Sequence, residues 1–289
     1  RHADQWRWAR FDEKDGVVYR PIPRDRDQAF PKYDGALLSV IMNIPPLRHM
    51  KGYKEDVNSI KWFNREPYPQ DLAFITKPGE GIWLEEAKKL QVELTDEAID
   101  KAFLSLPKEV QDETSDGIKA TLKKRRANLE KFALDYRTIL LKTVLIAGTD
   151  RKDRFVISRL PGGNTTVEVY STKKDGAEVV RHSNTYNYKE TKELWLYGLD
   201  DDDEFEVKGE PEHPILVRLL GGQNNDSYSI ENGRRIKVYD FKSKKNTFST
   251  DAKTRLVLTD DYETNSYDPK KPQYNIFAGY PLAGYNPDD

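Results

Sequence analysis

The second half of the chain carries a repeat that constrains its fold more than any other feature. An Asp or Asn residue, one intervening residue and an aromatic residue recur at intervals of roughly twenty residues. The four copies are Asn184-Thr185-Tyr186, Asp203-Glu204-Phe205, Asp226-Ser227-Tyr228 and Asn246-Thr247-Phe248. Repeats of this length are typical of solenoids, in which each turn stacks on the next. We therefore favour a short parallel β-solenoid with the aromatic side chains inside and the Asx residues capping turns. An antiparallel sandwich is the alternative.

Residues 149–268 as a whole read as an all-β domain. Short segments rich in Val, Ile, Leu and Tyr alternate there with Gly, Asn, Asp and Lys, as expected for strands separated by turns. We expect strands at Phe155–Leu160, Val167–Thr172, Glu193–Leu199, Ile215–Leu220, Arg235–Phe241 and Arg255–Thr259. Residues 269–289 contain four prolines among Gly and Asn, which predicts an extended tail.

The preceding region, residues 51–148, reads as helical. Thr95 is a good N-cap for a helix that we expect to run to Leu106, before Pro107. A longer helix is predicted from Ser115 to Gly148, because apolar residues recur there at spacings of three and four. The basic run 123–126 lies inside it and forms either a solvated face or a contact with phosphate or lipid.

The first fifty residues open with a predicted β-hairpin. Two strand-like segments flank an Asp-Gly turn at residues 12–16, which sets Gln5 opposite Pro23 or Arg24. Asp25 and Asp27 then lie at the same end of the ribbon as Gln5. An amide and carboxylates meeting there suit Mg²⁺ or Mn²⁺ that carries nucleotide phosphates. A solvated structural hairpin and a different metal site are the alternatives.

Composition excludes several classes of site. The chain has no Cys and only four His, so thiol chemistry, disulfides and a His-rich metal centre are not expected. The 47 basic and 49 acidic residues leave a net charge of -2, which argues against a nucleic-acid binder.

The opening segment resembles the atypical kinases of the spore-coat CotH type and related secretory-pathway kinases. Arg1-His2 is similar to the end of their Asp-Arg-His element, and Asp25-x-Asp27-x-x-Phe30 matches their second motif. The resemblance implies a kinase C-lobe-like fold for residues 1–148 and an ATP-dependent phosphotransferase activity in a longer protein. Gln5, Asp25 and Asp27 would then hold Mg²⁺ or Mn²⁺ with ATP. The catalytic Asp is expected directly before Arg1, so no catalytic residue is assigned within the chain.

A turn of the all-β domain resembles the calcium-binding β-roll nonapeptide. Residues 221–229 follow the pattern Gly-Gly-x-Gly-x-Asp-x-apolar-x except at Asn224, and residues 198–206 follow it more loosely. The resemblance makes Asp201, Asp203, Asn224 and Asp226 candidate calcium ligands. Because the two copies are not in tandem, we favour Asx-stabilised turns without metal.

The order of parts also resembles the middle of large outer-membrane-associated proteins of Gram-negative bacteria. These carry a calcineurin-like metallophosphoesterase at one end and a BamA/TamA-like surface-antigen barrel at the other. The stretches that carry the resemblance are Asp4–Trp8, Pro21–Gln28 and the tail Pro281–Asp289. It implies a periplasmic or cell-surface location, partners in the rest of the same polypeptide and among outer-membrane proteins, and membrane contact only through a barrel that follows the tail.

Three functions are therefore considered. The first is an incomplete kinase-like site for a divalent metal and a nucleotide. The second is a non-catalytic module that links or docks a phosphoesterase domain and a membrane barrel. The third is a calcium-stabilised β module.

Overall fold

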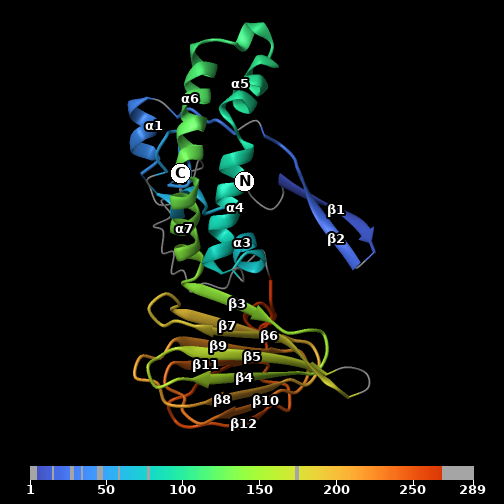
Figure 1. The fold of residues 1–289 in the computed structure, drawn as a ribbon. Coiled ribbons are helices and arrows are strands. Elements are labelled where there is room, and N and C mark those ends of the chain that lie inside the picture. The colour runs from blue at the N-terminus through green and yellow to red at the C-terminus, as the bar shows by residue number, and fades with distance from the viewer. Residues whose placement is uncertain are drawn as a thin grey trace, which may run out of the picture.

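The computed structural model describes residues 5–14, 16–26, 29–33, 35–43, 48–57, 59–76, 79–172 and 176–268. Figure 1 shows two parts, one made of helices and a projecting β-hairpin and the other made of stacked strands. Helices and strands are thus segregated along the chain, which confirms the predicted α+β class.

The projecting hairpin pairs β1 (Trp6–Glu13) with β2 (Gly16–Pro23) in antiparallel register. Glu13 pairs with Gly16, whose φ of 141° is a conformation that favours glycine, so the turn lies where the sequence predicts it. Most side chains of the ribbon are exposed. Trp8 is 47% exposed, and its ring centroid lies 5.9 Å from that of Phe74 in the helical part.

The helical part consists of short helices packed around a longer helix and the two consecutive helices that run antiparallel to it (Figure 1). Its elements are α1 (Ala36–Ile41), α2 (Ile60–Phe63), α3 (Tyr68–Phe74), α4 (Glu80–Glu93), α5 (Asp96–Leu104), the 3-10 turn η3 (Lys108–Val110), α6 (Glu113–Ala127) and α7 (Leu129–Leu140). Helix α4 packs against α6 and α7. Leu72, Tyr136 and Leu140 form the buried centre of this part, and each buried Leu contributes about 1.5–3 kcal/mol.

Helix α5 begins as the sequence predicts. The hydroxyl of Thr95 accepts a hydrogen bond from the Ala98 amide at 3.1 Å, which satisfies one of the free donors of the first turn. The helix ends at Leu104, shortly before Pro107.

The helix predicted from Ser115 to Gly148 is confirmed as helical to Leu140 but is interrupted at Asn128, and its last part is wrong. Helix α6 ends at Ala127, α7 ends at Leu140, and residues 143–147 form the strand β3 (Thr143–Ala147). Val144 and Ile146 are buried on one face of that strand, because β-branched residues fit a pleated surface better than a helix. The all-β part therefore begins before the boundary expected at residue 148.

The all-β part is a two-sheet stack of parallel rungs. One sheet has the order β13-β11-β9-β7-β3, and its strands are all parallel. The second sheet has the order β12-β10-β8-β4-β5-β6 and is parallel from β12 to β4. The strands are β4 (Asp153–Arg159), β5 (Thr165–Thr172), β6 (Glu178–Tyr186), β7 (Glu193–Leu199), β8 (Glu204–Lys208), β9 (Leu216–Gly222), β10 (Ser227–Ile230), β11 (Ile236–Asp240), β12 (Thr247–Ser249) and β13 (Arg255–Leu258).

The chain passes from one sheet to the other and back in each repeat, so the short parallel β-solenoid is confirmed and the sandwich alternative is wrong. A stack of aromatic rings runs through its interior. Phe155, Phe205, Tyr228 and Phe248 are in register on neighbouring strands, with ring centroids 4.6, 5.1 and 5.2 Å apart. These side chains point inward, as the Asx-x-aromatic repeat predicts.

One copy of the predicted repeat is not a rung. Asn184-Thr185-Tyr186 lies on β6, which pairs with β5 in antiparallel register, and the β5–β6 hairpin extends the second sheet beyond β4 at its edge. The first rung is supplied by Asp153-Arg154-Phe155 instead, in register with Asp203-Glu204-Phe205 one turn later.

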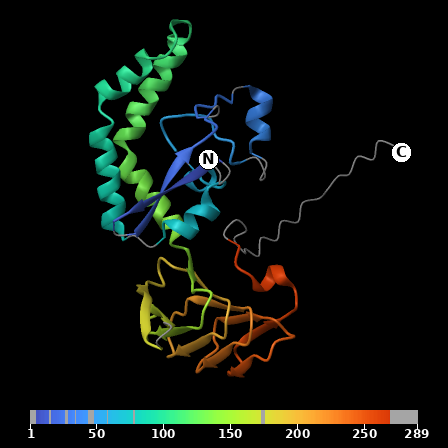
Figure 2. The ribbon, with the colours of Figure 1, turned by 90° about the vertical axis from the view of Figure 1, so that its right-hand side faces the viewer.

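The C-terminal end of the described chain covers one solenoid face. Helix α8 (Tyr262–Asn265) lies beside β9 and β11, as Figure 2 shows in red at one side of the stack. Tyr267 follows it and packs against Tyr197, with ring centroids 4.8 Å apart. The predicted tail, residues 269–289, lies outside the described residues.

Candidate functional site

The open end of the hairpin is where two of the predicted ligands meet. The Arg24 amide donates a hydrogen bond to the Gln5 carbonyl oxygen at 2.8 Å, one step beyond the pair of Trp6 and Pro23. The predicted register is therefore confirmed, and Asp25 follows directly. The third predicted ligand, Asp27, lies outside the described residues.

Gln5 and Asp25 line one cavity of about 580 Å³. Its walls come from the base of the hairpin, from the loop before α2 and from the turn between α2 and α3. Pockets for small ligands and cofactors have volumes of about 300–1,000 Å³, so the cavity is large enough for a nucleotide. Other lining residues are Arg26, Tyr33, His49, Lys51, Tyr53 and Glu66.

The backbone at Asp25 directs the chain into this cavity. Its φ of 48° lies in the left-handed region, which Asp adopts more readily than most residues other than Gly. The turn ends the strand pairing after Pro23 and brings both Asp25 and Arg26 to the cavity wall. The Arg26 guanidinium lies 4.7 Å from the centroid of the Trp6 ring, a cation–π contact that ties it to the strand.

The opposite wall is polar as well. The His49 Nδ1 atom lies 3.9 Å from Glu66 Oε1, and Lys51 and Tyr53 stand beside them in the lining. The Tyr53 hydroxyl is buried and has no hydrogen-bond partner within the described ranges. Burial raises the pKa of this phenol, and the nearby Arg125 guanidinium partly opposes the shift.

These residues fit a hydrated divalent cation. Mg²⁺ binds oxygen ligands, keeps several waters and commonly takes only one or two protein carboxylates. The Gln5 side-chain amide and the Asp25 carboxylate are ligands of that kind, and both residues line the cavity, one before β1 and the other after β2. Within the described part of the chain no group of three or more His, Cys, Asp or Glu side chains is placed to hold a metal ion.

The predicted calcium ligands Asp203 and Asp226 belong to a different structure, a column of side chains inside the solenoid turns. The Asp203 Oδ1 atom accepts the Asp153 amide at 2.7 Å, and Asp226 Oδ1 accepts the Asp203 amide at 2.8 Å. Asn246 Oδ1 continues the column by accepting the Asp226 amide at 2.8 Å. The expected Asx-stabilised turns are therefore present, and each one links a rung to the next.

Burial raises the pKa of these carboxyl groups and so makes them weaker acids. Asp203 and Asp226 are both 1% exposed, and one oxygen of each lacks a hydrogen-bond partner within the described ranges. Loss of hydration raises the pKa of Asp203 to about 9 and also raises the pKa of Asp226. Burial likewise raises the pKa of Asp240, which accepts a 2.7 Å hydrogen bond from the Tyr228 hydroxyl.

The other two calcium candidates lie on the outside of the same turns. Asp201 is exposed and accepts a hydrogen bond from the Lys152 amide at 3.2 Å. Asn224 donates through its side-chain amide to Asp200 Oδ1 at 2.9 Å. Both have positive φ angles, 74° and 71°, which Asp and Asn tolerate in tight turns.

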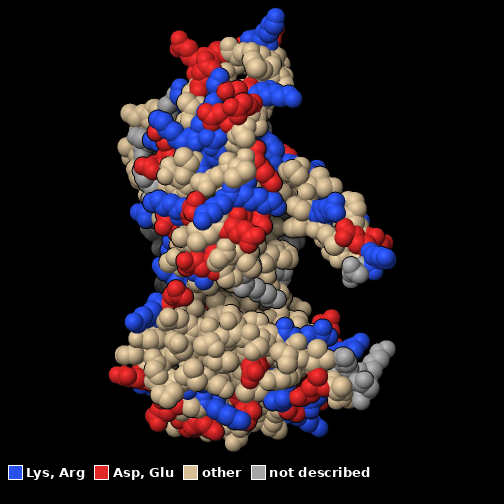
Figure 3. Space-filling view, in the orientation of Figure 1, with Lys and Arg blue, Asp and Glu red and all other residues tan. Residues whose placement is uncertain are grey.

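Several residues of these sites were not predicted. Asp153 has the same spacing from Gly148 as Asp203 has from Gly198, and that Gly-x4-Asp spacing could have identified it. Lys51 also lines cavities of the helical part, and no local motif marks it. Arg125 belongs to the basic run 123–126, for which a phosphate or lipid contact was one of the two predictions, but the run alone does not distinguish Arg125 from its neighbours. Acidic and basic side chains are interleaved over the face of the helical part in Figure 3, so sequence charge does not single out either residue.

No family model matches this chain, and no curated protein or solved structure is significantly similar to it. The kinase and outer-membrane resemblances therefore stay predictions. No helix in the described ranges has the length and apolar character needed to cross a membrane.

Proposed function

We propose that the cavity at the base of the hairpin binds a divalent cation together with nucleotide phosphates, as part of a kinase-like phosphotransferase site. The observation that carries this proposal is that Gln5, just before β1, and Asp25, just after β2, line one cavity of about 580 Å³. In the proposed setting the chain is one region of a larger, exported and outer-membrane-associated protein.

The chemistry of the lining supports this choice of ligand. In phosphoryl transfer a bound Mg²⁺ or Mn²⁺ neutralises charge on the phosphate oxygens, and protein carboxylate and amide oxygens hold the ion. Asp25 supplies the charged ligand and Gln5 the neutral one. Arg26 and Lys51 line the same cavity and are suited to the phosphate oxygens. None of these side chains is assigned as a general base, so the proposal concerns binding.

Calorimetric titration of the 289-residue chain with Mg²⁺·ATP tests the proposal. We expect binding by the wild type and a loss of roughly tenfold or more in Asp25→Asn, which removes the charge of one ligand. Asp12→Asn is the matched control, because Asp12 is an exposed hairpin carboxylate that pairs with Arg10 far from the cavity. Equal affinity in the wild type and Asp25→Asn, or no binding by the wild type, would refute the proposal.

A second candidate function is a non-catalytic linking or docking module. It is favoured by the hairpin, whose exposed apolar side chains include Phe11, Tyr19 and Ile22. The interior of the solenoid is filled by its own aromatic and aliphatic side chains, which suits a rigid spacer. A folded wild-type chain that binds neither Mg²⁺ nor nucleotide in the titration favours this function over the first.

A further inference from the structure

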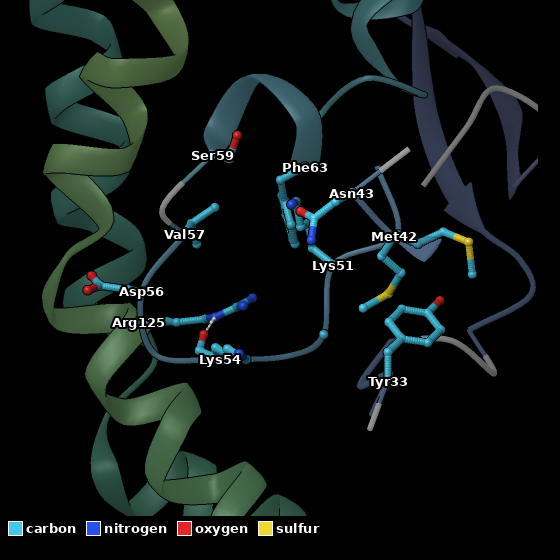
Figure 4. Close-up of a pocket in the computed structure, with 12 residues that line it drawn as sticks. Tyr33, Met42, Asn43, Lys51, Lys54, Asp56, Val57, Ser59, Phe63 and Arg125 are labelled. Carbon is cyan, nitrogen blue, oxygen red and sulfur yellow. Dashed lines mark hydrogen bonds between the residues drawn. The ribbon is translucent and has the colours of Figure 1, made fainter. Parts of the chain in front are cut away.

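A second cavity adjoins the proposed metal site. It has a volume of about 270 Å³ and shares Tyr33, Met50, Lys51 and Phe63 with the larger cavity. Figure 4 shows that most of its lining comes from the segments around α1 and α2, including the loop before α2, and that helix α6 closes it from the other side. The helix contributes one residue, Arg125.

Arg125 differs from the other members of the basic run 123–126. Lys123 pairs with Asp96 and Asp100, Lys124 pairs with Glu55, and Arg126 pairs with Asp96. These three cations form the salt-bridged face that the sequence suggests. Arg125 has no carboxylate partner within the described ranges, and its side chain reaches into the cavity instead (Figure 4).

Two contacts fix the Arg125 guanidinium in place. Its Nε atom donates a hydrogen bond to the Lys54 carbonyl oxygen at 2.6 Å, and the Tyr53 ring centroid lies 4.1 Å away. Both contacts leave the two terminal nitrogens without a hydrogen-bond acceptor in the described part of the chain. A planar guanidinium held in this way presents its remaining donors as a pre-organised fork, which matches two oxygens of a phosphate.

Further positive charge lines the same cavity. The Lys51 ammonium has neither a hydrogen bond nor an ion pair within the described ranges, and Lys54 also contributes to the lining. Asp56 is the only acidic residue among the lining residues. Tyr33 and Ser59 add hydroxyl groups that can donate to an anion.

We propose that this smaller cavity binds the phosphate group of a small soluble phosphate ester through Arg125 and Lys51. The cavity volume suits a ligand of a few carbon atoms beyond the phosphate. The site needs no metal ion, since its ligands are cations and hydroxyl groups. It shares Lys51 and part of its lining with the cavity of the proposed metal site. Neither proposed metal ligand, Gln5 or Asp25, lines it, so phosphate binding here does not require the metal ion.

Titration with inorganic phosphate in the presence of EDTA and at constant ionic strength tests this inference. The readout is the ¹⁵N–¹H resonance of the Arg125 Nε group, together with the dissociation constant from backbone amide shifts. We expect saturable binding by the wild type and a loss of roughly tenfold or more in both Arg125→Met and Lys51→Met. Lys124→Met, which changes the neighbouring paired cation on α6, leaves the constant unchanged.

Three comparisons decide the outcome: the fold and affinity of Lys51→Met, binding to lipid vesicles, and the behaviour of Asp25→Asn. Lys51→Met removes no hydrogen bond or ion pair within the described ranges, so we expect its fold to stay native even if Arg125→Met perturbs the loop at Lys54. Unchanged phosphate affinity in a natively folded Lys51→Met refutes the site, as does binding to phosphatidic acid vesicles without binding to free phosphate. Asp25→Asn retains phosphate binding in EDTA, which separates this inference from the metal-dependent nucleotide site.

Discussion

The buried column of acids in the solenoid turns allows a pH-dependent stability to be predicted from one substitution, Asp203→Asn. The change replaces one carboxyl oxygen with an amide nitrogen and keeps the side-chain shape. Asn246 already occupies the equivalent place two rungs later, where its oxygen accepts a rung-to-rung hydrogen bond. A side-chain amide therefore fits this column, and its oxygen can accept the hydrogen bond from the Asp153 backbone amide in the same way.

The sign of the effect follows from the raised pKa of Asp203. Burial raises the pKa of Asp203 from 3.8 to about 9, so the folded protein keeps a proton that the unfolded chain releases above about pH 4. The stability that this group contributes is complete below the unfolded pKa and is lost as pH rises toward the folded pKa. The loss is about 1.4 kcal/mol per pH unit in that window, or about 2.7 kcal/mol between pH 5 and pH 7. Asn at this position does not titrate and escapes the loss.

Urea unfolding of the wild type and Asp203→Asn at pH 5, 6, 7 and 8 measures the effect. Near-ultraviolet circular dichroism follows the solenoid, because its stacked rings contribute to that signal. The difference in the free energy of unfolding, variant minus wild type, should increase by about 2–3 kcal/mol between pH 5 and pH 7. Asp201→Asn, the same change at an exposed carboxylate of a neighbouring turn, is the matched control. A stability difference between Asp203→Asn and the wild type that stays constant across this pH range would refute the reasoning.

Two other predictions concern the solenoid turns. Gly198→Ala should destabilise the solenoid by about 1–3 kcal/mol in the same urea assay, because the added methyl group would overlap Asp203 Oδ2 and the Gly221 carbonyl oxygen. Gly117→Ala on α6, where a Cβ atom meets nothing within 4 Å, should instead stabilise by about 0.5–1 kcal/mol, and a comparable loss at both positions would contradict the packing account. Calcium in place of EDTA should change the melting temperature little, since Asp203 and Asp226 each use an oxygen to bind a backbone amide; a rise of many degrees would show a calcium site.

The solenoid could be predicted from the sequence because each rung carries its own local signal. The strand predicted at Glu193–Leu199 coincides with β7, since turn residues bound an apolar run on both sides. The strands β8, β10 and β12 are too short for such a signal, and the aromatic residue at the second position of each one identified its rung. Asp153 was not predicted as part of the repeat because the β5–β6 hairpin separates it from Asp203 by 50 residues.

The features that could not be predicted depend on contacts between distant parts of the chain. Val144 follows Leu140 at a helical spacing, so periodicity alone extended the helix into what tertiary packing makes the strand β3. The phosphate cavity joins Arg125 to Lys54, which are 71 residues apart and connected through a loop without a repeating pattern. The hairpin end was predictable, in contrast, because turn position and strand register follow from local sequence.

The location of a bound metal ion tests the central claim most directly. Mn²⁺ with ATP, added to the ¹⁵N-labelled chain, broadens amide resonances near the ion. We predict that the resonances of Gln5, Asp25 and Arg26 broaden first and that Asp25→Asn abolishes this selectivity. Selective broadening of the solenoid turns at residues 200–203 and 224–226 instead, or uniform weak broadening along the chain, would contradict a metal and nucleotide site at the base of the hairpin.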